Sequence, residues 1–144
     1  MTTFNTSREI PAAPDLVFAA IRNPQRLARW WGPAGFTNTI TGFDFTPGGR
    51  WSLTMHGPNG ANYPNELVFA VIDAPGRVAV QHVSEPKFLL TITLAATAAG
   101  TLVSWAQTFE SAEVAARLEP IVVPANDQNL ERLAAEVLQP PSVG

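Results

Sequence analysis

Two histidines, His56 and His82, are the side chains best suited to moving a proton near neutral pH. His56 directly precedes a turn rich in glycine and proline, whereas His82 alternates with Val78 and Val80 and is predicted to point inward. Neither has a carboxylate at metal-ligand spacing, so the sequence predicts no metal site. For each of the two, an ordinary role as a hydrogen-bonded or surface side chain is favoured over a catalytic role.

Tyr63 and Glu66 are the other candidates for acid–base chemistry. A buried phenol needs a hydrogen-bond partner, so Tyr63 could orient a ligand. A buried Glu66 would have a raised pKa and could act as an acid or a base. Its alternation with Asn65 and Leu67 instead predicts that Glu66 faces solvent, on the side of the strand opposite Tyr63.

Several common classes of function have no support in the sequence. There is no cysteine, which excludes disulfides, thiol nucleophiles and zinc–thiolate sites. The glycines of 48–49 and 57–60 are typical of turns, and no helix start follows them, so they predict no phosphate-binding loop. No serine nucleophile-elbow pattern occurs. The net charge is −3 and the arginines are scattered, so no nucleic-acid partner is expected.

The elements that must position these side chains begin with a strand over 3–10 and two short helices. Pro14 and Asp15 favour a helix start, and apolar residues at helical spacing follow them. Asn23 as the N-cap and Pro24 as the first helical residue predict the second helix.

Six runs of alternating apolar and polar residues come next, divided by turns rich in glycine, proline and asparagine. The links between runs are short, so each strand is predicted to pair antiparallel with the next one. The predicted strands span 36–45, 50–56, 61–74, 77–84, 87–95 and 101–109.

The C-terminal region predicts a short helix and then a long one. Ser111 is the expected N-cap of the short helix, which Pro120 and Pro124 should interrupt. A new cap at Asn126 or Asp127 then begins the last helix. Its apolar stripe consists of Leu130, Leu133, Ala134, Val137 and Leu138, whereas Glu131, Arg132 and Glu136 lie off the stripe. We expect one domain over 1–139 and a flexible tail over 140–144.

Trp30 and Trp31 stand where the second helix meets the first strand of the meander. Neighbouring helix positions lie about 100° apart, so one indole can join the core while the other lines a different space. A sheet this long must curl, and the last helix can cover its concave face. The predicted fold is therefore α+β: a curved antiparallel sheet of about seven strands wraps around a long C-terminal helix, with two short helices after strand 1. Side chains that do not fill this gap would leave an apolar cavity.

Short motifs across nearly the whole chain form a specific combination, which includes Asn23-Pro24, Trp30-Trp31-Gly32-Pro33, Pro47-Gly48-Gly49-Arg50-Trp51, Tyr63-Pro64-Asn65 and Thr108-Phe109-Glu110-Ser111. With these motifs the chain resembles START-like helix-grip proteins, the superfamily of polyketide cyclases and plant pollen allergens. Within it, the chain resembles the branch named after the activator of heat-shock-protein ATPase. The resemblance implies the helix-grip fold and a ligand cavity, and it leaves the chemistry open because one fold hosts many functions.

The leading hypothesis is that the cavity binds a small hydrophobic ligand without a cofactor. The side chains predicted to line it come from the turn after the second helix, from alternating strand positions and from the last helix. They are Trp31, Phe36, Trp51, Met55, Tyr63, His82, Phe88, Trp105, Asn129 and Leu133. Asn65 and Gln107 are further polar candidates.

Two other functions stay open at this point. A cofactor-independent enzyme of the cyclase or hydrolase type could use the same cavity, with Tyr63, His56 or His82 as the proton-transfer group. A protein-interaction module is the second alternative, although a chaperone partner is not expected from one predicted domain. The N-terminus predicts no secretion signal, and the longest apolar run, 67–72, is too short to insert in a membrane, so a cytoplasmic location is expected. The sequence does not decide whether the protein forms a homodimer.

Overall fold

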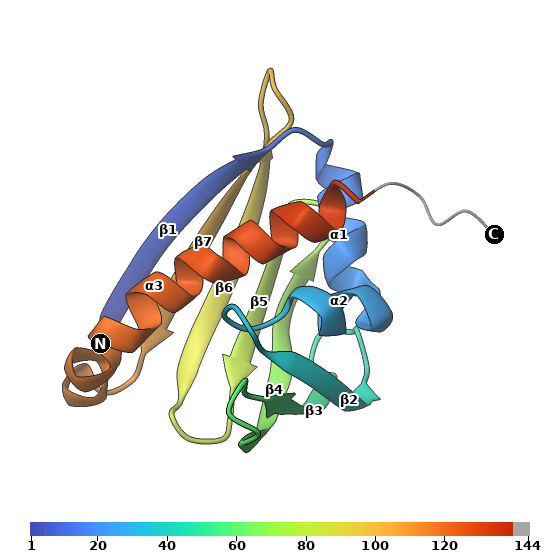
Figure 1. Ribbon diagram of the computed structural model, residues 1–144. Coiled ribbons are helices and arrows are strands. Elements are labelled where there is room, and N and C mark those ends of the chain that lie inside the picture. The colour runs from blue at the N-terminus through green and yellow to red at the C-terminus, as the bar shows by residue number, and fades with distance from the viewer. Residues whose placement is uncertain (140–144) are drawn as a thin grey trace.

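The computed structural model describes residues 1–139, in which one seven-stranded sheet combines with three helices (Figure 1). The strands are β1 (Thr2–Ile10), β2 (Thr37–Phe43), β3 (Arg50–His56), β4 (Asn62–Asp73), β5 (Arg77–His82), β6 (Phe88–Ala96) and β7 (Thr101–Phe109). The helices are α1 (Pro14–Arg22), α2 (Pro24–Trp30) and α3 (Ala112–Val137). The tail predicted over 140–144 lies outside the described residues.

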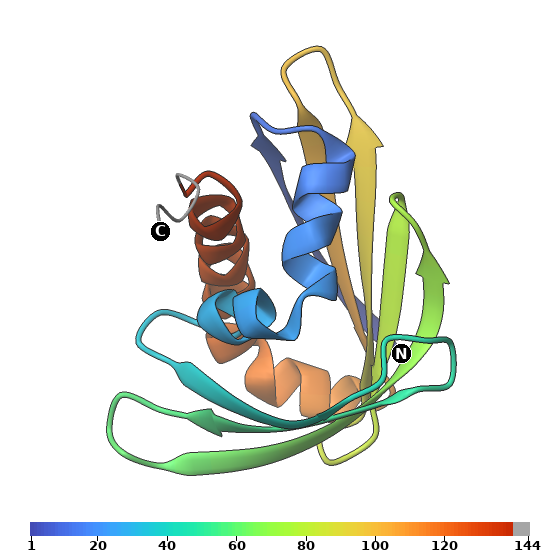
Figure 2. The same ribbon diagram turned by 90° about the vertical axis from the view of Figure 1, so that its right-hand side faces the viewer.

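The strands follow the order β1-β7-β6-β5-β4-β3-β2, and every neighbouring pair is antiparallel. The sheet curves around the helices (Figure 2). Register shifts between Ile40 and Gly42, and between Phe69 and Val71, mark two irregularities of the kind that bend strands. The predicted six-strand meander and the α+β helix-grip arrangement are confirmed.

Alternation along the strands decides which side chains face α3. On β3, Trp51 and Leu53 are buried on the concave face, and their cross-strand neighbours on β4 include the fully buried Leu67. Ser52 and Glu66 pair on the opposite, convex face. The strand pattern therefore supplies one apolar face for the helices and one polar face for solvent.

The short helices begin where the sequence predicts. Asn23 caps α2, because its side-chain Oδ1 accepts hydrogen bonds from the backbone N–H groups of Gln25 (2.9 Å) and Arg26 (3.3 Å). Proline occupies the first turn of both helices, where its missing N–H costs no hydrogen bond. Both helices therefore owe their starts to local chemistry.

Helix α3 differs from the prediction, because Ala112–Val137 form one continuous helix of 26 residues that contains Pro120 and Pro124. Ser111 is its N-cap, as predicted, and accepts a hydrogen bond from the N–H of Val114 (3.1 Å). The helix changes direction in its first half instead of ending there (Figures 1 and 2). Bending is the usual response to a proline that tertiary contacts keep inside a helix.

The predicted second cap at Asn126 or Asp127 is wrong, because both side chains bond across to the sheet. Asn126 Nδ2 donates to Gln107 Oε1 (3.0 Å), and Asp127 Oδ1 accepts from the Thr6 hydroxyl (2.5 Å). These contacts hold α3 over β7 and β1 and favour a continuous helix through the proline segment. Of the predicted stripe, Leu130, Leu133 and Ala134 belong to the core.

Leu138 departs from the predicted stripe, because it is the C-cap residue of α3 and remains 48% exposed. Glu136 departs in the other direction: it lies off the stripe but is only 4% exposed. Within residues 1–139, no helix combines the length and the hydropathy needed to cross a membrane.

Candidate ligand-binding site

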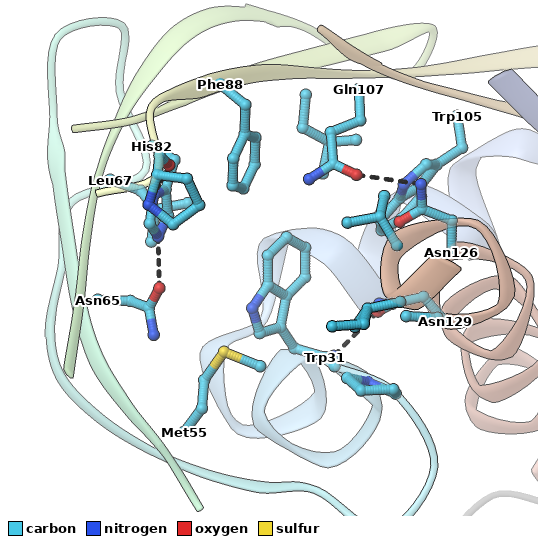
Figure 3. A pocket seen from close by; sticks show the side chains of 17 residues that line it. Trp31, Met55, Asn65, Leu67, His82, Phe88, Trp105, Gln107, Asn126 and Asn129 are labelled. Atoms are coloured by element: carbon cyan, nitrogen blue, oxygen red, sulfur yellow. Dashed lines mark hydrogen bonds between the residues drawn. The ribbon is translucent and has the colours of Figure 1, made fainter. Parts of the chain in front are cut away.

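A cavity of about 260 Å³ lies between the curved sheet and α3 (Figure 3). Strands β3 to β7 form one wall and contribute Met55, Asn65, Leu67, His82, Phe88 and Trp105. The bent part of α3 forms the facing wall, with Ile121, Val122, Ala125, Asn126 and Asn129. The turn after α2 closes one side with Trp31, Gly32 and Pro33. The cavity is therefore built from all three regions that the sequence analysis singled out.

Of the ten side chains predicted to line a ligand site, the structure brings six to the cavity. These six are Trp31, Met55, His82, Phe88, Trp105 and Asn129. The additional polar candidates Asn65 and Gln107 also line it. Alternation selected the strand residues, the position of the twin tryptophans selected Trp31, and the last helix supplied Asn129.

The other four predicted residues lie elsewhere. Trp51 is in the core, with its ring stacked on Phe69 at 5.9 Å and 4°, and Leu133 is completely buried beneath α3. Tyr63 shares the concave face with its partner Met55 but lies near the beginning of β4, so it is 46% exposed and its ring lies 6.0 Å from that of Phe36. None of the four, Phe36 included, borders the cavity.

The two adjacent tryptophans have different surroundings, because Trp30 ends α2 and Trp31 is the C-cap residue with an extended backbone. Trp30 is 1% exposed and its indole N–H donates to the carbonyl oxygen of Ala20 (2.9 Å), which ties α2 to α1. Trp31 turns toward the cavity, and its ring centroid lies 4.8 Å from that of Trp51. One indole therefore stabilises the helical corner and the other forms a cavity wall.

Arg132 holds the turn that carries Trp31, a role that its position off the apolar stripe did not suggest. Its guanidinium donates at 2.8–3.3 Å to backbone carbonyl oxygens at the end of α2 and in the following turn. The accepting residues are Arg29, Trp31, Gly32, Pro33 and Phe36. These oxygens lack helical partners, so one planar cation satisfies several of them. Burial lowers the pKa of Arg132.

Asn129 fixes the same turn from the cavity side. Its Oδ1 accepts a hydrogen bond from the backbone N–H of Gly32 (2.9 Å). Gly32 has a φ of 98°, and a Cβ there would lie 2.9 Å from the Met55 methyl and 3.2 Å from Phe36. A glycine is therefore required by the backbone conformation and by the close approach of the cavity wall.

Glu136 joins α3 to α2 through two arginines. Its carboxylate oxygens accept from Arg29 Nε (2.9 Å) and Arg26 Nε (3.0 Å). The hydrogen bond from Arg29, reinforced by Arg26, lowers the pKa of Glu136 despite its burial. Sequence spacing places Glu136 off the apolar stripe of α3. Its burial is tolerable only because α2, once docked, supplies the positive charges of Arg26 and Arg29.

His82 lies inside the cavity wall, and its ring is stacked on Phe88 with centroids 4.6 Å apart. Nδ1 is 2.7 Å from the carbonyl oxygen of Pro86, and Nε2 contacts Oδ1 of Asn65. Only the imidazolium can donate to both oxygens, but burial opposes that charge and lowers the pKa of His82. Burial outweighs the opposing pull of the Pro86 carbonyl and the Glu85 carboxylate.

The remaining acid–base candidates face away from the cavity. His56 lies between the Thr39 hydroxyl and Oδ1 of Asn62, each 2.7 Å from a ring nitrogen, on exposed strand positions. Glu66 faces solvent, as predicted, and accepts from the Ser52 hydroxyl at 2.5 Å. Within residues 1–139 there is no group of three or more acidic, histidine or cysteine side chains able to hold a metal ion.

Polar side chains lie on both sides of the cavity. Trp105, Gln107, Asn126 and Asn129 lie toward α3, whereas Asn65 and His82, bonded to each other, lie with Met55, Leu67 and Phe88 on the opposite side (Figure 3). The Trp105 indole N–H is buried and has no hydrogen-bond partner among residues 1–139. The Trp51 indole N–H is also unpaired, but Trp51 does not border the cavity. The cavity therefore has an apolar middle between two polar ends, and the buried indole N–H without a partner belongs to the end beneath α3.

Solved structures of bacterial proteins share this fold. A crystal structure from Chromobacterium violaceum has 25% identity and a TM-score of 0.85, and covers 97% of this chain and 100% of that one. A solution structure from Arthrobacter aurescens has 25% identity and a TM-score of 0.88, over 96% and 87% of the two chains. The AHSA1-like protein from Aeromonas hydrophila has 19% identity and a TM-score of 0.77, over 99% of each.

No curated protein matches the chain significantly. Residues 11–137 match the family described as activator of Hsp90 ATPase homolog 1-like protein. This range starts after β1 and contains every helix and every cavity-lining residue. The chain therefore belongs to the activator of Hsp90 ATPase homolog 1-like family, whose START-like fold is a scaffold for ligand binding.

Proposed function

We propose that this protein binds a small, largely apolar molecule in the cavity between β3–β7 and α3. The observation that carries the proposal is an unfilled space of about 260 Å³ in a region where the surrounding core is otherwise closely packed. Three aromatic walls, Trp31, Phe88 and Trp105, surround that space. Apolar walls with a few polar groups are the usual composition of small-molecule sites.

Access supports binding from solution. Ile121 borders the cavity and is 67% exposed, so the wall formed by α3 is thin at this point. An exposed apolar side chain at the edge of an apolar space is suited to the passage of a hydrophobic ligand. Ile121 lies between Pro120 and Pro124 in α3 and borders the cavity.

The test is fluorescence titration with the two-ring probe 1-naphthylamine, which is uncharged at pH 7. We expect saturable binding to the wild-type protein and at least about tenfold weaker binding to Ala125→Phe, whose new ring would occupy the cavity. The matched control is Ala116→Phe, an exposed position on the same helix, which should bind as the wild type does. Absence of saturable binding, or equal binding by both variants, would overturn the proposal.

A cofactor-independent reaction of the cyclase or hydrolase type is the second candidate function, because His82 provides a buried imidazole with a lowered pKa in the cavity wall. In that case a bound compound would be converted, and His82→Gln would lose turnover while retaining binding. A turnover rate that is unchanged in His82→Gln would exclude His82 as the proton-transfer group.

A further inference from the structure

The charge of the cavity wall restricts the ligand. Among the described residues that line the cavity, none is aspartate, glutamate, lysine or arginine, and His82 is the single group there that titrates near neutral pH. Burial lowers the pKa of His82, so the wall is uncharged at pH 7. A charged ligand would lose its hydration without gaining an ionic partner, which is a large cost.

The hydrogen-bonding groups on the α3 side add a second restriction, because donors without a partner outnumber acceptors without a partner there. The Trp105 indole N–H can only donate, and it is buried without a partner among residues 1–139. The orientation of the Asn129 amide is set by chemistry: the Gly32 N–H can only donate, so Oδ1 must face it. Asn129 Nδ2 is then left over as a donor.

The Gln107–Asn126 pair does not change this balance. One amide of the pair donates to the other across 3.0 Å. Whichever way the two amides are turned, one N–H group and one oxygen remain for other partners. The pair therefore adds as many donors as acceptors. The donors in excess are the indole N–H of Trp105 and Nδ2 of Asn129.

The positions of these groups give the ligand a direction. Both surplus donors belong to the α3 side of the cavity, whereas the other side holds Met55, Leu67 and Phe88 together with Asn65 and His82, which bond to each other (Figure 3). A volume of about 260 Å³ exceeds the roughly 150 Å³ that holds a benzene molecule in an engineered apolar cavity. There is room for one substituted ring or two fused rings.

We infer, on the basis of the proposed function, that the ligand is an uncharged one- or two-ring compound with an oxygen acceptor such as a ketone. The oxygen end lies beneath α3, where the N–H groups of Trp105 and Asn129 donate to it. The ring system lies between Trp31 and Phe88. The hydrogen bond from Trp105 also satisfies a buried donor that has no partner among residues 1–139, and such a donor is costly to bury alone.

The experiment compares three naphthalenes of the same shape by titration calorimetry. 2-Acetylnaphthalene has the acceptor, 2-isopropenylnaphthalene replaces the oxygen by a methylene group, and 2-naphthoate adds a charge. We expect the acetyl compound to bind about tenfold tighter than the isopropenyl compound, and naphthoate to bind weakest. Equal affinities of the two uncharged compounds, or tightest binding of naphthoate, would overturn this inference alone. Saturable binding of none of the three would instead overturn the proposed function.

Two variants assign the donors. Trp105→Phe keeps an aromatic wall but removes the indole N–H, so the preference for the acetyl compound should fall to about twofold or less. Asn129→Asp keeps the acceptor for the Gly32 N–H and removes the amide donor, so the preference should fall there too. Thermal unfolding shows whether each variant is folded. If both variants are folded and keep the wild-type preference for the acetyl compound, Trp105 and Asn129 are not the donors.

Discussion

The two halves of helix α3 differ in how they are held. The second half packs Leu130, Leu133 and Ala134 into the core. Its charged residues Arg132 and Glu136 bond to the turn after α2 and to α2 itself. The first half contains Pro120 and Pro124, bends, and leaves Ile121 exposed beside the cavity.

The contrast teaches that the same helix can hold the fold and border a cavity if the two tasks are separated along its length. A proline removes one backbone hydrogen bond from the helix and disturbs the turn before it. Such a weakness is tolerable where the helix covers a space, and costly where it must hold the core. Four predictions test this difference, from the largest expected effect to the smallest.

The largest effect is expected from Leu133→Ala. Leu133 is completely buried, so truncation should lower the free energy of unfolding by about 2–5 kcal/mol, measured by urea denaturation. Ile121→Ala in the first half is the matched control and should cost less than about 1 kcal/mol, because Ile121 is mostly exposed. Similar losses of unfolding free energy in the two variants would contradict the proposal that only the second half of α3 holds the core.

Native-state amide hydrogen exchange should show the same contrast without mutation. We expect the amides of 121–123 to exchange at least about 100-fold faster than those of Leu130, Leu133 and Ala134. The reason is that the prolines remove neighbouring helical hydrogen bonds, while the second half opens only with the core. Uniform protection along α3 would contradict this expectation.

Glu136→Gln should weaken the link between α3 and α2 by about 1–2 kcal/mol, because its arginine partners are partly exposed and can regain water. Arg29 and Arg26 lower the pKa of Glu136 in the folded state, so the carboxylate stabilises the protein above its ordinary pKa of 4.5. That contribution disappears as the pH falls through the lowered pKa. Urea denaturation between pH 6 and 3 should therefore show a shallower acid loss in Glu136→Gln than in the wild type.

The smallest effect is expected at His82, in the wall that faces the first half of α3. Burial lowers the pKa of His82 below its ordinary value of 6.5, so the unfolded chain binds more protons below that pH. Stability should be fully present above pH 6.5 and should fall as the pH drops toward the lowered pKa. His82→Gln should flatten this dependence between pH 7.5 and 5. Persistence of the full wild-type pH dependence in His82→Gln would contradict the role given to the burial of His82.

Prediction of the site from the sequence succeeded where a local pattern decides the outcome. Alternation placed His82 on the inner face and Glu66 on the outer face of the sheet. The end of the second helix separated Trp30 from Trp31. It failed for Tyr63 and Trp51, because a correct face does not say how far a side chain lies from the edge of the sheet or from the cavity.

The residues that the sequence analysis missed act over long separations. Arg132 reaches carbonyl oxygens about 100 residues earlier in the chain, and Glu136 bonds to arginines 107 and 110 residues away. No spacing rule connects such positions, since the partners meet only when α2 and α3 are docked. Position off the apolar stripe indicated a solvent-exposed side chain for both.

The sequence by itself determined the strands, the pairing of each strand from β2 to β7 with the next, the caps at Asn23 and Ser111, and the apolar face of the sheet. Each depends on hydrogen bonds or alternation among residues close together in the chain, so the necessary information is local. The tertiary structure decided that α3 continues through two prolines, that Arg132 and Glu136 are structural, and that a space remains beside Trp31. Those outcomes depend on packing between elements that are distant in the chain. The space left between side chains and the pairing of buried charges are set only when these elements are docked.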